Sequence, residues 1–93
     1  MNFEMEIKID KSFQKDTNRI KDKAVLLKIA NTIEAIQRVQ NLNKIKNLKK
    51  LRGAQATYRI RIGDYRIGII ISESTVEFIR CLQRKDIYKY FPK

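Results

Sequence analysis

The sequence predicts an α+β fold: a single domain, residues 1–93, in which a helical hairpin packs on one face of a mostly antiparallel sheet. Three patterns support this. Apolar and polar residues alternate near the N-terminus, residues 24–40 carry apolar side chains at helical spacing, and the C-terminal half alternates again. Helices that come before a run of strands are typical of α+β proteins. The expected order is therefore an N-terminal strand, two helices and three strands (β-α-α-β-β-β), followed by a short tail.

The first strand and the helical hairpin occupy the N-terminal half. Residues 2–9 alternate between apolar and polar side chains, which indicates a strand with one buried face. Asp10 or Ser12 is suited to cap a short helix that carries Phe13 and Ile20 on its apolar side. The second helix, from Ala24 to about Gln40, has an apolar stripe wide enough to cover a sheet: Leu26 (or Leu27 beside it), Ile29, Ala30, Ile33, Ile36 and Val39.

A basic connector is expected from Asn41 to Arg52. Its last nine residues hold five positive charges and no acid: Lys44, Lys46, Lys49, Lys50 and Arg52. Such a run is usually solvated, but this one leads directly into further arginines. The clustering of basic residues in one continuous segment indicates a polyanion partner more strongly than the total charge does.

A β-hairpin is predicted from Tyr58 to Ile71. Its first half alternates between apolar residues and arginines, and Gly63-Asp64 is a two-residue turn of the kind that hairpins use. This turn fixes which residues lie opposite each other: Ile62 and Tyr65, Arg61 and Arg66, Ile60 and Ile67, and Arg59 and Gly68.

The predicted register gathers three arginines, Arg59, Arg61 and Arg66, on one face of the hairpin. Like charges placed directly opposite each other destabilise a sheet. Gly68 leaves the same face without a side chain, and a glycine in a strand often marks the close approach of a ligand or another backbone. An anionic partner would offset the repulsion between the arginines; the alternative interpretation is a solvated polar face.

A third C-terminal strand is expected from Thr75 to Leu82, with Val76, Phe78 and Ile79 as core candidates. Its alternation is imperfect, which a bulge or burial on both faces would explain, and the face taken by Arg80 stays open. The chain then leaves the sheet at Gln83-Arg84-Lys85-Asp86 and ends in a short aromatic segment containing Ile87, Tyr88, Tyr90 and Phe91.

Composition narrows the function. The chain has 21 Lys+Arg against 10 Asp+Glu, a formal charge of +11, so nucleic acid is the first candidate partner, an acidic protein the second and an anionic membrane surface the third. Without histidine, a His acid–base pair or a Ser/His triad is excluded. With no histidine and Cys81 as the single cysteine, a zinc site is not expected, and no cluster of Asp and Glu suggests Mg²⁺. No metal or cofactor is therefore predicted. No signal peptide or membrane span is expected, and a cytoplasmic location fits.

Two motifs resemble those of a known family. The first is K-L-R-G-x-x-x-x-Y-R-I-R-I-G-D-Y-R-I, from Lys50 to Ile67, and the second is Q-R-K-D-I-Y, from Gln83 to Tyr88, with a hydrophobic strand between them. In this combination the chain resembles RelE-type toxins of the RelE/ParE superfamily of toxin–antitoxin systems. The order and size of the elements agree with that family over essentially the whole chain.

The resemblance implies a ribosome-dependent mRNA interferase that cuts messenger RNA in the ribosomal A site. It implies that the RNA 2′-hydroxyl is the nucleophile, that no metal takes part, and that a RelB-like, acidic or amphipathic antitoxin is the cognate partner. The residues that match the family's catalytic positions are Arg59, Arg61, Arg66, Arg84 and Tyr88. Residues expected to bind RNA phosphates without reading sequence are Lys49, Lys50, Arg52 and Lys85.

The roles implied by the resemblance agree with the chemistry of the side chains. Arg61 and Arg66 are suited to clamp a phosphate, because the guanidinium fork matches phosphate geometry. Arg84 can stabilise the leaving oxygen, and Tyr88 can stack on a base or exchange a proton; a structural role at the edge of the core is the alternative for Tyr88.

The chain departs from the family pattern at the group that would move a proton. Many relatives have lysine at the two strand positions, here Arg59 and Arg61, and histidine where this chain has Gln83. Because arginine cannot lose its proton, proton transfer must fall to Tyr88, to a lysine with a lowered pKa, or to charge stabilisation alone. Two other functions therefore stay open: a ParE-like inhibitor of DNA gyrase and a non-catalytic, basic RNA-binding module.

Overall fold

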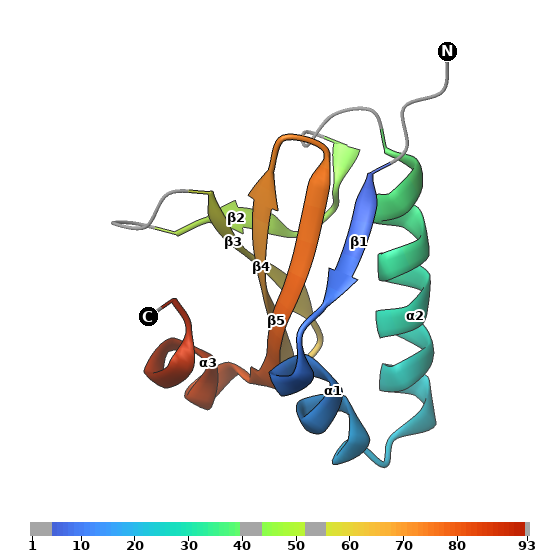
Figure 1. Ribbon diagram of the computed structural model, residues 1–93. Coiled ribbons are helices and arrows are strands. Elements are labelled where there is room, and N and C mark those ends of the chain that lie inside the picture. The colour runs from blue at the N-terminus through green and yellow to red at the C-terminus, as the bar shows by residue number, and fades with distance from the viewer. Residues whose placement is uncertain (1–4, 40–43, 52–55, 93) are drawn as a thin grey trace.

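The computed structural model describes residues 5–39, 44–51 and 56–92. The strands in these ranges form one sheet with the order β1-β5-β4-β3-β2 (Figure 1). The elements are β1 (Glu6–Ile9), α1 (Lys11–Asn18), α2 (Lys23–Arg38), β2 (Leu48–Lys50), β3 (Thr57–Ile62), β4 (Tyr65–Ser72), β5 (Thr75–Gln83) and α3 (Arg84–Tyr90). β1 runs parallel to β5, and the other neighbouring strands are antiparallel. The predicted α+β class and the order of its elements are confirmed.

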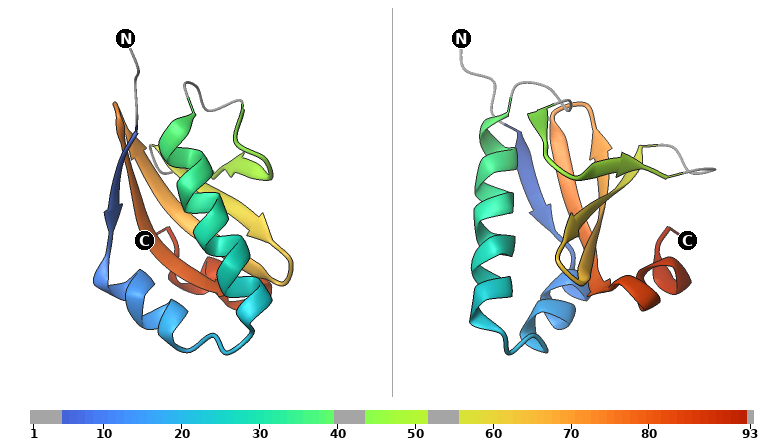
Figure 2. Two further views of the ribbon diagram at one scale, coloured as in Figure 1. Left: turned by 90° about the vertical axis from the view of Figure 1, so that its right-hand side faces the viewer. Right: turned by 180° about the vertical axis from the view of Figure 1, so that it is seen from behind.

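Both predicted helices begin at aspartates that cap their N-termini. The Asp10 carboxylate accepts a hydrogen bond from the Ser12 amide at 3.0 Å, and Asp22 accepts from the amides of Ala24 and Val25. On α2, Ile29 and Ile36 are buried in the core, Leu26, Ile33 and Val39 are half-buried, and Leu27 and Ala30 are exposed. The stripe of α2 is therefore narrower than predicted, and α2 lies along the sheet (Figure 2).

The helix α1 lies beside the edge of β5, beyond the end of β1. The last hydrogen bond between these strands is made by the Asp10 amide, which donates to the Phe78 carbonyl at 2.9 Å. Farther along β5, the buried Asp16 carboxylate of α1 accepts from the Cys81 amide at 2.9 Å and so takes the place of a strand partner. Asp16 also accepts two hydrogen bonds from Arg80, at 2.7 and 3.1 Å. This contact answers the open question of where Arg80 points.

The hairpin has the predicted register. Ile62 pairs with Tyr65, and the pairing continues in steps to Arg59 and Gly68. Gly63 has φ 56°, a backbone conformation that glycine adopts without strain and that short hairpin turns require. A bulge between β4 and β5 follows Gly68, which pairs with Arg80, whereas Ile69 pairs with Phe78. This bulge is the cause of the imperfect alternation in the last strand.

Two short elements were not predicted. The connector contains the strand β2, which pairs with β3, and the aromatic tail is the helix α3. β2 has three residues, too few to show a period, and forms because the hairpin offers it an edge. Of the remaining expectations, Ile9 is 39% exposed rather than buried, and Phe3, Gln40 and Arg52 lie outside the described residues.

The C-terminal segment covers part of the arginine face, which is the face of the sheet that carries Arg59, Arg61 and Arg66 and for which an anionic partner or solvent was predicted. A Cβ atom on Gly68 would lie 2.5 Å from Cδ2 of Phe91, so the Phe91 ring occupies the place of a side chain there. Arg59 is directly opposite Gly68, so Phe91 and Arg59 share one face of the sheet. The position of α3 beside the end of β5 is visible in Figure 2. Because Gly68 has no side chain, the protein's own C-terminal segment can pack against the sheet at this position.

Candidate functional site

Four strands contribute to the arginine face. Lys49 of β2 lies opposite Arg59, Arg59 lies opposite Gly68, and Gly68 lies opposite Arg80. In the adjacent row, Arg61 lies directly opposite Arg66. Because residues opposite each other share a face, the register alone brings Lys49 and the three predicted arginines of the hairpin together.

Arg66 lies at the centre of this group. Only 8% of its surface is exposed, and its Nη1 donates to the carbonyls of Gly63 at 2.7 Å and Tyr65 at 3.0 Å. Within the described residues, no protein acceptor binds Nε or Nη2 of Arg66. The turn of the hairpin thus fixes the guanidinium and leaves part of its fork available to an anion.

The other four predicted catalytic residues all influence the pKa of Arg66. Burial lowers the pKa of Arg66, and the positive charges of Arg59, Arg84 and Arg61 lower it further, in that order, while Tyr88 acts in the opposite direction. Arginine stays protonated in proteins even so. The lowered pKa means that the charged form of Arg66 is disfavoured by its surroundings and would be stabilised by a bound phosphate.

Asn47 accepts hydrogen bonds from the other two arginines of the hairpin. The sequence analysis did not identify this residue. Its backbone carbonyl accepts from Nη1 of Arg59 at 3.1 Å, and its side-chain oxygen accepts from Nη2 of Arg61 at 3.4 Å. Asn47 has φ 63°, a conformation that asparagine tolerates better than most residues, which was a usable signal. Nε of Arg59 is buried and has no hydrogen-bond partner in the described structure.

Arg84 and Tyr88 both come from α3. They are four residues apart, so they lie on the same side of the helix. The amide of Arg84 donates to the Asp64 carbonyl at 2.7 Å, which joins the start of α3 to the turn of the hairpin. With Asp64, Gln83 and Lys85 they line a hollow of about 630 Å³. Tyr88 is 57% exposed, so the alternative role as a residue at the edge of the core does not fit.

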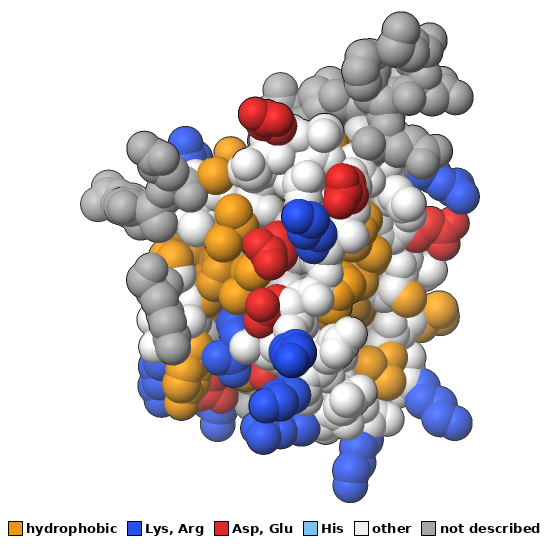
Figure 3. All heavy atoms as spheres, in the orientation of Figure 1, with side chains coloured by type: hydrophobic (Ala, Val, Ile, Leu, Met, Phe, Trp, Pro, Cys, Tyr) orange, Lys and Arg blue, Asp and Glu red, His pale blue; other side chains and the backbone are white. Residues whose placement is uncertain are grey.

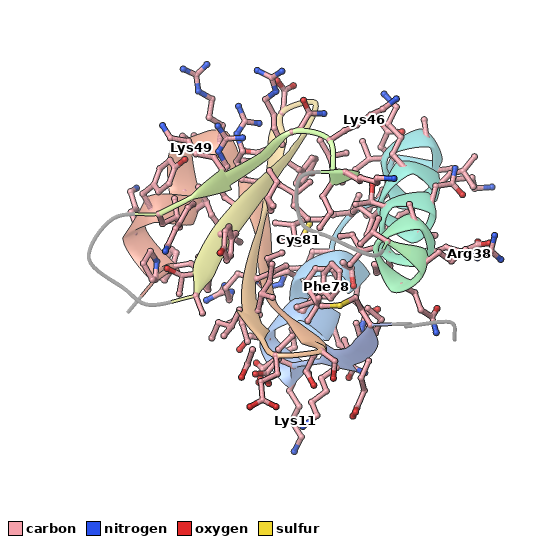
Figure 4. The ribbon with its side chains drawn as sticks, turned by 90° about the horizontal axis from the view of Figure 1, so that it is seen from above. Lys11, Arg38, Lys46, Lys49, Phe78 and Cys81 are labelled. Carbon is pink, nitrogen blue, oxygen red and sulfur yellow. The ribbon has the colours of Figure 1, made fainter. Side chains whose placement is uncertain are left out.

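The predicted phosphate-binding residues are placed differently from one another. Lys49 is exposed on the arginine face (Figure 4), and Lys85 lines the hollow beside Arg84. Lys50 lies opposite Tyr58, so it points to the other face of the sheet. Arg52 lies outside the described residues. On the face drawn in Figure 3, basic side chains gather at the lower edge near α1 and α3, away from most of the acidic ones.

The described residues hold neither a cluster of metal-ligand side chains nor a membrane-spanning helix. No three His, Cys, Asp or Glu side chains among residues 5–39, 44–51 and 56–92 gather as metal ligands would. In the same ranges, no helix has the length and apolar character needed to cross a membrane. Chemistry without a metal or cofactor stays a prediction.

The helical hairpin, the mostly antiparallel sheet with its arginine face, and the C-terminal helix with Arg84 and Tyr88 together define a small basic protein of the RelE/ParE toxin class. A family model described as the ParE toxin of the type II toxin–antitoxin system parDE matches residues 7–88. Toxin RelE3 of Methanocaldococcus jannaschii is 40% identical over 89 residues, which cover 95% of this chain and 100% of that protein. The chain therefore belongs to the RelE/ParE superfamily of type II toxins, and the predicted resemblance is confirmed.

Solved structures agree with this assignment. The RelB–RelE antitoxin–toxin complex from Methanococcus jannaschii superimposes with a TM-score of 0.78 at 39% identity, covering 91% of this chain and 99% of that one. The YoeB dimer from Staphylococcus aureus, at 19% identity and a TM-score of 0.72, covers 87% of this chain and 98% of that one and shares the fold. Because the family names include both ParE and RelE, they leave the target of this toxin open.

Proposed function

We propose that this type II toxin is a ribosome-dependent mRNA endonuclease that needs no metal. The observation that carries the proposal is the position of Arg66, which is held by the hairpin turn and surrounded by Arg59, Arg61, Arg84 and Tyr88. Cationic groups fixed in advance around one point stabilise the charge that develops on a reacting phosphate. A solvated polar face would not require a buried arginine among three others.

The proposed reaction is an in-line displacement within the RNA. The 2′-oxygen of one nucleotide forms a bond to the adjacent phosphorus, and the bond from phosphorus to the 5′-oxygen of the next nucleotide breaks. The 2′-hydroxyl loses a proton and the departing 5′-oxygen gains one, so the products are a 2′,3′-cyclic phosphate and a 5′-hydroxyl. Arg61 and Arg66 bind the non-bridging oxygens, and Arg84 stabilises the departing oxygen.

Proton transfer in this reaction cannot use the arginines. Tyr88 and Lys85 border the hollow and are suited to exchange a proton with the RNA, whereas Gln83 cannot titrate. Charge stabilisation by Arg61, Arg66 and Arg84 then carries a larger share of the rate than in a nuclease with a histidine base. A slow enzyme that depends on the ribosome to align its substrate is the expected result.

Ribosome-bound messenger RNA incubated with the purified toxin tests the proposal. Cuts within the A-site codon that leave 2′,3′-cyclic ends are expected. Arg66→Ala should slow cleavage by about 10²-fold or more, the usual loss when one charge-stabilising donor is removed, and Tyr88→Phe should slow it as well. Arg38→Ala is the matched control, because Arg38 is an exposed arginine of α2 that pairs with Glu34 away from the arginine face (Figure 4).

The two other functions both leave ribosome-bound messenger RNA uncut, and a gyrase supercoiling assay together with an RNA-binding assay separates them. A ParE-like protein would leave the messenger RNA intact and inhibit supercoiling by DNA gyrase. A non-catalytic module would bind RNA and do neither. If both Arg66→Ala and Tyr88→Phe cut as fast as the unchanged protein, the site assignment is wrong even though cleavage occurs.

We also propose that a RelB-like antitoxin neutralises this toxin. The related structure from Methanococcus jannaschii is a RelB–RelE antitoxin–toxin complex. In the present chain, a groove of about 570 Å³ between α2 and β3 has an apolar floor that includes Ile36, Ile45 and Ile60. Its charged lining residues are all basic: Lys28, Lys44, Lys46 and Arg61. An amphipathic acidic segment matches both features, and at Arg61 it would reach the arginine face.

Charge reversal at the groove tests this docking site. Lys44→Glu combined with Lys46→Glu should weaken binding of the cognate antitoxin at least tenfold, because each acid would repel the acidic segment. Lys11→Glu combined with Lys15→Glu, both on α1, is the control, because it makes the same change of net charge and Lys11 lies at the far side of the molecule (Figure 4). Equal affinity of the groove variant and the control would place the antitoxin elsewhere.

A further inference from the structure

The hollow at the start of α3 is lined by more kinds of side chain than phosphate binding requires. Its lining combines an aromatic ring (Tyr88), two cations (Arg84 and Lys85), an amide (Gln83) and a carboxylate (Asp64). Cations suit the RNA backbone, and an exposed aromatic ring suits the face of an unstacked base. The amide and the carboxylate have no part in the proposed cleavage, so their presence calls for a separate explanation.

Asp64 is the unexpected member of this set. Its carboxylate is exposed and makes no hydrogen bond or ion pair with any described residue, although two cations line the same hollow. A free carboxylate repels the phosphates of RNA, so it opposes general RNA binding at this place. A Gly-Asp turn accounts for the residue type, because aspartate is common in turns, but not for a hollow that Asp64 lines together with Tyr88.

The place of Asp64 is fixed by its backbone. The Asp64 carbonyl accepts from the Arg84 amide at 2.7 Å, and the neighbouring Tyr65 pairs with Gln83 across β4 and β5. The adjacent Gly63 carbonyl accepts from Nη1 of Arg66 at 2.7 Å. One tight turn therefore positions both the central arginine and the backbone of Asp64, so a base held at Asp64 would belong to a nucleotide next to the bound phosphate.

We infer that this hollow binds one unstacked nucleobase of the RNA and that Asp64 gives it a preference for guanine. A carboxylate can only accept hydrogen bonds. Guanine presents two adjacent donors on its Watson–Crick edge, N1–H and the N2 amino group, which match the two carboxylate oxygens. Adenine and cytosine present one amino group, and uracil presents one N3–H. Any base can stack on the ring of Tyr88, whereas the hydrogen bonds to Asp64 select guanine among the four bases.

Gln83 fits the same role. Its amide cannot titrate, so it cannot serve as the acid or base that histidine would be, but it can both donate and accept a hydrogen bond at a base edge. This inference rests on the proposed function in one respect: it takes single-stranded RNA to be the ligand of the arginine face. It goes further by naming the base and the residue that selects it.

Binding of short RNA analogues tests the inference without cleavage. The probes are four trinucleotides, 2′-O-methylated so that they cannot be cut, that differ only in the central base. At fixed salt, the guanine trinucleotide should bind about tenfold tighter than those with adenine, cytosine or uracil, the order of effect of one good bidentate contact. In Asp64→Asn, one carboxylate oxygen becomes an amino group facing the guanine donors, and the four affinities should fall within about twofold of each other.

The control is Asp86→Asn, which removes one negative charge from α3, where Asp86 lies 3.7 Å from Nζ of Lys89 and does not line the hollow. It should keep the guanine preference. The inference is wrong if Asp64→Asn keeps the preference, if the four trinucleotides bind equally, or if none binds. Guanine preference in a protein that never cuts ribosome-bound RNA would instead refute the nuclease and leave the base pocket standing.

Discussion

Cys81 is the residue whose titration has the clearest consequence for stability. It is 1% exposed, and burial, followed by the charge of Asp16, raises the pKa of its thiol to about 12. In the unfolded chain the thiol loses its proton near pH 8.5. Between these values the folded state keeps a proton that the unfolded state has lost, so the contribution of Cys81 to stability is full below about pH 8.5 and declines as the pH rises.

The expected loss is about 1.4 kcal/mol of unfolding free energy per pH unit between roughly pH 9 and 12. Lysines and tyrosines titrate in the same range, so the measurement is a comparison of denaturant unfolding for the unchanged protein and Cys81→Ala. The alanine variant should be less stable near neutral pH and should lose stability less steeply in alkali. Parallel curves would mean that the thiol titrates alike in both states.

At the scale of single elements, the contact between Gly68 and Phe91 holds α3 on the sheet. A Cβ atom at position 68 would be 2.5 Å from the Phe91 ring, closer than carbon atoms can approach. Ile87 and Phe91 are the buried residues of this segment, and Arg80 lies 5.1 Å from the ring centroid of Tyr90. Tyr88 depends on these few contacts for its position, and Arg84 depends on them and on the hydrogen bond from its amide to the Asp64 carbonyl.

Gly68→Ala should therefore lower the unfolding free energy by about 1–3 kcal/mol, the usual range for overpacking. It should also slow RNA cleavage, because a displaced α3 carries Arg84 and Tyr88 with it. A double-mutant cycle with Phe91→Ala separates this contact from a general effect of alanine in a strand. The cost of Gly68→Ala should be smaller by at least about 0.5 kcal/mol when Phe91 is already truncated. Additive costs would contradict the proposed contact.

The elements also show what the sequence could and could not predict. The hairpin register was predictable because alternation and a two-residue turn are local signals, and three site arginines followed from it. β2 and α3 were not predicted because they are short and are stabilised only by contacts with the rest of the fold. Asn47 joined the site for the same reason: its carbonyl and side chain meet Arg59 and Arg61 only after β2 has paired with β3.

At the scale of the whole molecule, only part of the formal charge of +11 lies where RNA is proposed to bind, namely the basic residues of the arginine face and those that line the hollow at α3. Counterion release makes the affinity for single-stranded RNA fall with salt in proportion to the number of phosphates that are neutralised. Lys49 lies opposite Arg59, whereas Lys11 begins α1 on the far side of the molecule (Figure 4). The two lysines contribute equally to net charge and differ in position.

Lys49→Ala should therefore reduce the slope of log affinity against log salt concentration by about 0.7, the value for one phosphate contact to a single strand. Lys11→Ala should leave that slope unchanged although it lowers the net charge by the same amount. The measurement is equilibrium binding of a 2′-O-methylated RNA between about 50 and 200 mM salt, the range in which such slopes are read. If both variants change the slope equally, RNA responds to the overall field of the protein, and the arginine face is not its particular binding site.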